Sequence, residues 1–220
     1  MREYRKRWLR AGVGLMALFA LWTALVLTVD VQSVGPNGTA VGFAAWNSWF
    51  HALTGVHMIL YHITDWLGLV PVFVCMIFGA LGLAQLVKRK SLRKVDGDLL
   101  LLGVYYGIVI GAYLLFEMIP INYRPVLIDG VLEASYPSST TLLVLSVMPT
   151  LLFQAQRRLN HAVARNILCA VTVCFSVFMV VGRLMAGVHW LTDIVGAVFL
   201  SGGLFCLYGE AVSAVDERKN

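Results

Sequence analysis

The chain has 220 residues, of which 59% are hydrophobic and 13% are charged. A soluble domain is roughly 25% charged, so this composition argues against a typical soluble enzyme and favours an integral membrane protein. The net charge of +5 comes from short basic clusters between apolar runs. Such clusters are typical of the cytoplasmic loops of membrane proteins, so we expect no nucleic-acid partner.

The N-terminal segment pairs a basic start with a long apolar run. The run covers residues 11–29 and no clear cleavage site follows it. A signal peptide has a shorter apolar region, so we interpret this segment as an uncleaved first membrane span.

Six apolar runs are long enough to cross a bilayer as helices. Their expected bounds are 11–29, 66–87, 98–118, 140–155, 166–182 and 193–209. They predict an all-α polytopic membrane protein with six transmembrane helices, forming a single membrane domain over residues 1–220.

The segment 40–64, between the first two spans, carries Trp46, Trp49, Phe50 and Leu53 at helical spacing with few charges. This pattern predicts an amphipathic helix lying in the membrane interface. A seventh, short span is the alternative.

The basic residues orient the predicted spans. Of the seventeen lysines and arginines, fifteen fall in the N-terminus, the loops after the second and fourth spans, and the C-terminal tail. The positive-inside rule places these segments in the cytoplasm, so we expect a multi-pass plasma-membrane protein with both termini cytoplasmic. The two remaining basic residues, Arg124 and Arg183, fall on the outer side.

Three polar segments meet on that outer side. The first contains Arg124 and Pro125, the second is YPSSTT at 136–141, and the third runs from Arg183 through His189 to Asp193. Arginines bind phosphate oxygens in forked geometry. Ser138 and Ser139, together with the amides at a helix N-terminus, add further donors.

His189 and Asp193 are four residues apart and share one face if the sixth span begins near them. The carboxylate then orients the imidazole through one ring nitrogen. An oriented histidine beside two arginines is a nucleophile facing an anion. The residues therefore predict an extracytoplasmic phosphate site.

No metal or cofactor site is expected. The four cysteines all fall inside apolar runs and form no CxxC pair, so they are interpreted as buried hydrophobic residues. Glu117, Asp129 and Glu133 share the outer segment but match no metal motif, and solvated loop acids are the favoured interpretation over a divalent-cation site.

These residues resemble the type 2 phosphatidic acid phosphatase superfamily, which includes lipid phosphate phosphatases and undecaprenyl-diphosphate phosphatases. Its motifs are KxxxxxxRP, PSGH and SRxxxxxHxxxD. The third is matched from Arg183 to Asp193, with Gly182 in place of serine. The other two are degraded: Glu117 stands at the lysine of the first, and Ser139 and Thr140 stand at the glycine and histidine of the second.

The resemblance implies a phosphatase-like core over 66–209 and a role for each matched residue. Arg124 and Arg183 would bind phosphate. His189 would attack phosphorus and form a phosphohistidine, held by Asp193. Water would then release phosphate, and no metal is required.

The departure at Thr140 bears on the substrate. The family's histidine protonates the leaving group, whereas an alcohol is far too weak an acid near neutral pH. A phosphate leaving from a diphosphate needs that proton less, because its second pKa is about 6. We therefore favour a polyprenyl diphosphate over phosphatidic acid, unless Glu117, His57 or His62 supplies the proton.

The leading functional hypothesis is thus a membrane lipid phosphate or diphosphate phosphatase. Two alternatives stay open. One is a catalytically weak pseudoenzyme that binds lipid phosphates, and the other is a phosphotransferase that passes the phosphoryl group to an acceptor other than water. The expected partners are the lipid substrate and membrane lipids.

Overall fold

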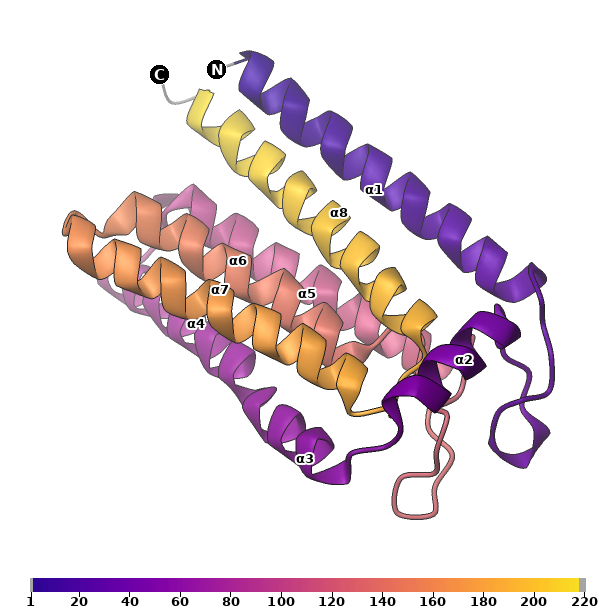
Figure 1. Ribbon diagram of the computed structural model, residues 1–220. Helices are drawn as coiled ribbons and strands as arrows, with labels where there is room; N and C mark the ends of the chain where they lie inside the picture. The colour runs from indigo at the N-terminus through magenta and orange to yellow at the C-terminus, as the bar shows by residue number, and fades with distance from the viewer. Residues whose placement is uncertain (1, 218–220) are drawn as a thin grey trace.

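The computed structural model describes residues 2–217, and within that range it forms long helices with no β-strand (Figure 1). The helices are α1 (Arg2–Thr28), α2 (Ala44–Thr54), α3 (Met58–Leu67), α4 (Leu69–Arg89), α5 (Gly97–Met118), α6 (Ser139–Arg158), α7 (Ala162–Met185) and α8 (Leu191–Glu217). Short 3-10 helices lie at η1 (Pro36–Gly38) and η2 (Leu92–Lys94). The all-α prediction is confirmed.

Six helical segments are long and apolar enough to cross a membrane. They are α1, the continuous pair α3–α4, and α5 to α8. Both ends of the described chain lie at the same end of the bundle, as an even number of crossings requires, and α2 lies at the opposite end (Figure 1). The protein is therefore a polytopic membrane protein with six spanning helices.

The second spanning segment begins earlier than the sequence predicts. It starts at Met58 and not near residue 66, because α3 runs into α4 through Gly68, whose backbone is itself helical. The predicted interfacial segment 40–64 therefore contains only one separate helix, α2. The other spans also extend beyond their predicted bounds, most clearly α8, which continues to Glu217.

The helix α2 exposes an apolar face at the end of the bundle. Trp46, Trp49 and Leu53 are 43%, 59% and 68% exposed, whereas Ala44 and Asn47 are buried. The Asn47 amide donates to Gly42 O and to Thr192 Oγ1. The amphipathic helix is confirmed as a helix, and its place in the membrane interface stays a prediction.

Small residues allow α1 to lie close along α8 (Figure 1). A Cβ added at Gly203 would meet Met16 Sδ at 2.8 Å, and one added at Gly12 would meet Leu207 at 2.9 Å. Helices in a bilayer associate through such close packing, because lipid provides no hydrophobic driving force between them. This contact fixes the axis of α8, whose first turn carries Asp193.

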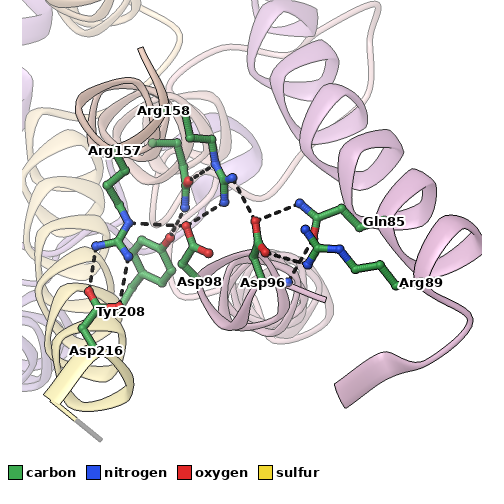
Figure 2. A network of polar contacts seen from close by, with 9 residues as sticks. Gln85, Arg89, Asp96, Asp98, Arg157, Arg158, Tyr208 and Asp216 are labelled. Carbon is green, nitrogen blue, oxygen red and sulfur yellow. Dashed lines mark hydrogen bonds and ion pairs between the residues drawn. The ribbon is translucent and has the colours of Figure 1, made fainter. Parts of the chain in front are cut away.

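A polar network joins the helix ends at the terminus-bearing end of the bundle (Figure 2). Asp96, at the start of α5, pairs with Arg89 of α4 at 2.8 Å and with Arg158 of α6 at 3.1 Å. Arg157 of α6 holds Asp216 of α8 through two contacts of 2.8 and 3.0 Å. The network is remote from the predicted phosphate site. Arg218 and Lys219, two of the basic residues used to orient the chain, lie outside the described residues.

Candidate functional site

The connection between α7 and α8 brings together the three charged residues of the third predicted segment. Nδ1 of His189 lies 3.6 Å from Oδ2 of Asp193, and Nε2 lies 3.5 Å from Nη2 of Arg183. A guanidinium has only donors, so Nε2 must be the accepting nitrogen and the ring proton belongs on Nδ1. The imidazole thus turns a lone pair toward the arginine and its N–H toward the carboxylate.

A glycine shapes this connection. Gly187 has a φ of +68°, and a Cβ added there would lie 1.9 Å from the carbonyl oxygen of Gly55. The neighbouring Ala186 carbonyl accepts from the His57 amide at 3.0 Å. The segment before α3 is therefore held against the α7–α8 turn, and this contact brings α3 to the site.

Asp193 is held by groups other than the histidine. Its Oδ2 accepts from the Trp190 amide at 2.9 Å, which caps the start of α8, and its Oδ1 accepts from Asn122 Nδ2 at 3.3 Å. The side chain is fully buried. Its carboxylate is thus fixed in a position from which it can orient the imidazole of His189.

The loop between α5 and α6 brings Arg124 to the same place. The loop folds back on itself through antiparallel bridges from Tyr123 to Ala134 and from Ile128 to Val131. Trp190 Nε1 donates to the Tyr123 carbonyl at 2.8 Å and ties the loop to α8. The side chain of Arg124 is buried and its Nε lies 2.9 Å from Oε2 of Glu133.

One aromatic ring joins the two arginines. The guanidinium carbons of Arg124 and Arg183 lie 5.7 and 5.0 Å from the centroid of the Tyr61 ring. Such cation–π contacts favour the charged guanidinium over an aromatic face. Arg124 and Arg183, which are 59 positions apart in the sequence, therefore face one ring on α3.

The helix α3 adds two further contacts that the sequence motifs did not predict. Arg183 Nη1 lies 3.4 Å from Thr64 Oγ1 and 3.7 Å from Asp65 Oδ1. Tyr61, Thr64 and Asp65 are spaced i, i+3 and i+4 and so share one face of a helix. This helical spacing could have indicated a shared face at the site. The interpretation of residues 40–64 as an interfacial segment obscured it.

The serines at the start of α6 differ in their surroundings. Ser138 is fully buried, and its hydroxyl donates to Thr141 Oγ1 at 3.1 Å. Its amide donates to the Asp193 carbonyl at 3.2 Å. Ser138 thus joins the start of α6 to the start of α8, whereas Ser139 and Thr140 are half-buried and line an adjoining cavity.

The remaining predicted residues lie farther out. Glu117 is exposed at the end of α5 and forms no ion pair within the described residues. Asp129 is exposed at the tip of the loop. His57 and His62 are exposed at the start of α3 and on its surface. Among residues 2–217, no group of three histidine, cysteine, aspartate or glutamate side chains is placed to hold a metal ion.

The electrostatic setting keeps the histidine neutral. Burial, followed by the positive charges of Arg124 and Arg183, lowers the pKa of His189 well below its ordinary value of 6.5. Buried Arg124 Nη1 and Arg183 Nε find no hydrogen-bond partner within the described residues. Buried donors of this kind are costly unless a ligand satisfies them, and an anion with several oxygens would do so.

An apolar cavity opens beside Asp65, which contacts Arg183. It has a volume of about 530 Å³ and lies between α4, α5 and α6. Asp65, Ser139 and Thr140 form its polar part, and the rest of its wall is mostly aliphatic and aromatic, including Leu69 and Val109. A ligand in this cavity would have a polar end near Arg183 and an apolar remainder among the helices.

The fold is shared with a solved protein. The crystal structure of a transmembrane PAP2-type phosphatidylglycerolphosphate phosphatase from Bacillus subtilis matches with a TM-score of 0.65 at 17% identity, covering 96% of this chain and 98% of that chain. No protein-family model and no curated protein matches the sequence. The structural likeness shows that the chain has the fold of a transmembrane PAP2-type protein, as the motif resemblance implied.

Proposed function

We propose that the protein is a lipid phosphate or diphosphate phosphatase of the type 2 phosphatidic acid phosphatase superfamily. The observation that carries the proposal is the placement of a buried, neutral imidazole 3.5 Å from the guanidinium of Arg183, with Arg124 sharing the same Tyr61 ring. Two buried cations beside an oriented nucleophile suit attack on a phosphoryl group.

In the proposed reaction, the phosphoryl oxygens lie between Arg124 and Arg183. Nε2 of His189 attacks phosphorus, and Asp193 stabilises the positive charge that develops on the ring through Nδ1–H. Water then attacks the phosphohistidine and releases phosphate. The amide groups at the start of α6, near Ser139, add donors at a helix N-terminus.

The cavity that Asp65, Ser139 and Thr140 line supports a lipid as the substrate. Its walls are largely apolar and it lies among spanning helices, which suits a hydrocarbon chain attached to a phosphate. A polyprenyl diphosphate is the favoured substrate, because Thr140 cannot protonate a leaving alkoxide. A leaving phosphate is already stable near neutral pH.

We also propose that the site faces the extracytoplasmic side of the plasma membrane. The basic clusters at the ends of α4 and α6 lie at the opposite end of the bundle from His189. The positive-inside rule assigns that end to the cytoplasm.

The test is phosphate release by the purified protein from a diphosphate lipid and a monophosphate lipid with the same tail. We expect release from both, faster from the diphosphate, unaffected by a metal chelator and absent in His189→Ala. Lipid binding without release by the wild type would support a pseudoenzyme instead. Product formed only with an added acceptor would support a phosphotransferase, and inhibition by the chelator would contradict the metal-free mechanism.

A further inference from the structure

Asp65 lies where a proton donor to the leaving group is needed. Its Oδ1 is 3.7 Å from Nη1 of Arg183, whereas Nε2 of His189 is 3.5 Å from Nη2 of the same guanidinium. The attacking nitrogen and the carboxyl group therefore approach different nitrogens of one phosphate-binding side chain. In-line displacement needs its nucleophile and its leaving group on opposite sides of phosphorus, so an acid must reach the phosphate from a different direction than His189 does.

Asp65 lies near Thr140, which stands at the position of the family's acidic histidine. Asp65 and Thr140 line the same cavity, and a Cβ added at Gly68 would lie 3.5 Å from Thr140 Cγ2. The Gly68 amide donates to the Asp65 carbonyl at 3.0 Å, so the two residues lie within one helical turn. A lipid phosphate that enters from the cavity would bring its ester oxygen past both Thr140 and Asp65.

The other acids near the site are less well placed. Glu133 contacts Nε of Arg124 and does not line the cavity. Glu117 lies at the exposed end of α5. The Asp65 side chain, by contrast, is 55% exposed and beside Arg183, so a substrate can reach it directly.

We infer that Asp65 is the general acid of this site and takes the place of a histidine at position 140. The inference rests on the proposed phosphatase function and deepens it. With Asp65 as the acid, a phosphomonoester lipid is a substrate as well, and the preference for a diphosphate, which assumed that no acid replaces the histidine at position 140, no longer follows. The lone pair of His189 Nε2 forms a bond to phosphorus while the bond from phosphorus to the leaving oxygen breaks. The electron pair of that bond stays on the oxygen, which takes the carboxyl proton of Asp65.

The same group returns to its starting state in the second step. Water attacks phosphorus and gives a proton to the Asp65 carboxylate, and the electron pair of the P–N bond returns to Nε2. Thr140 takes no part in the proton transfer.

The test compares kcat/KM of the wild type and Asp65→Asn for octyl phosphate and p-nitrophenyl phosphate. This parameter includes only steps up to the departure of the leaving group. Octyl alkoxide needs a proton and nitrophenolate does not. General acid catalysis contributes roughly 10²–10⁴-fold, so Asp65→Asn should lower the ratio of octyl to nitrophenyl rates by about 10²-fold or more.

Controls separate this role from a structural one. Asp129→Asn, at the exposed loop tip, should leave both rates unchanged. Glu133→Gln should alter both rates by the same factor, since it acts through Arg124. Adding Thr140→His to Asp65→Asn should restore part of the octyl phosphate rate, because it returns an acid to the same cavity.

Failure of the Asp65 assignment can be distinguished from failure of the proposed phosphatase function. An unchanged ratio in Asp65→Asn, or a wild type that hydrolyses only the nitrophenyl ester, overturns the assignment of Asp65 and leaves the phosphatase intact. Loss of both activities by an equal factor in well-folded Asp65→Asn also overturns it. A wild type without activity toward any phosphate ester contradicts the phosphatase itself.

Discussion

At the level of single residues, the proposed reactivity of His189 depends on how its ring is held. Nδ1 faces the buried carboxylate of Asp193, which itself accepts from the Trp190 amide and from Asn122. Asp193→Asn keeps the shape of the side chain but removes the charge and allows the wrong tautomer. We expect kcat to fall by about 10³–10⁴-fold, as for a triad aspartate, while the unfolding midpoint changes little. A phosphate-release assay beside a thermal melt checks both, and an activity loss below tenfold would contradict the orienting role.

The buried state of the same imidazole predicts a pH dependence of stability. The pKa of His189 is lowered in the folded protein, so below about pH 6.5 the unfolded chain binds a proton that the folded chain does not. Stability should be retained above that pH and decline as pH falls, by up to about 1.4 kcal/mol per pH unit. His189→Gln has no imidazole at this position and so lacks this pH-dependent contribution to the free energy of unfolding. The difference in unfolding free energy between the two proteins should therefore change between pH 7.5 and 5, and a constant difference would show that the ring is not buried in neutral form.

Sequence patterns located most of the residues of the site but not all. Arg124, Arg183, His189 and Asp193 stand out because charge is costly near lipid, and the structure brings all four together. Tyr61 and Asp65 did not stand out in this way, because they lie near the end of the segment that the sequence pattern assigned to the membrane interface. Their role depends on α3 packing against α7, a contact between residues far apart in the chain.

At the scale of elements, the α7–α8 turn can adopt its path only with a glycine at position 187. Gly187 and Gly130 both have positive φ, but only at Gly187 would a Cβ collide, at 1.9 Å from Gly55 O. We expect Gly130→Ala to cost roughly 1–2 kcal/mol from backbone strain alone and to keep full activity. Gly187→Ala should be more destabilising and should lose activity, because α3 and the turn must separate. Thermal unfolding and phosphate release of both variants provide the check, and equal behaviour of the pair would argue against the contact.

Helix number could be predicted from apolar length, whereas helix bounds could not. The start of α3 was missed because residues 58–65 mix apolar and polar side chains, as an interfacial helix also does. The structure extends the spanning segment back to Met58. The polar side chains of α3 that weakened the apolar signal include Thr64 and Asp65, which contact Arg183.

In the molecule as a whole, the clusters of basic residues and the candidate phosphate site lie at opposite ends of the helix bundle. This arrangement predicts the orientation in the membrane. In a background without Cys75, Cys169, Cys174 and Cys206, Asp129→Cys should react with an impermeant thiol reagent added to intact cells. Lys90→Cys should react only after the membrane is opened. Both positions are exposed in the protein, so burial does not explain a difference, and the reverse labelling would place the site in the cytoplasm.

In the proposed reaction His189 becomes covalently phosphorylated, and this intermediate can be trapped. The protein is mixed with a lipid carrying ³²P in its terminal phosphate, quenched in alkali within the first turnover, and digested. A phosphoramidate survives alkali and breaks in acid. We expect alkali-stable, acid-labile label on the peptide that contains His189, and no label in His189→Ala. Phosphate release by the wild type without such label, or label on any other residue, would contradict it.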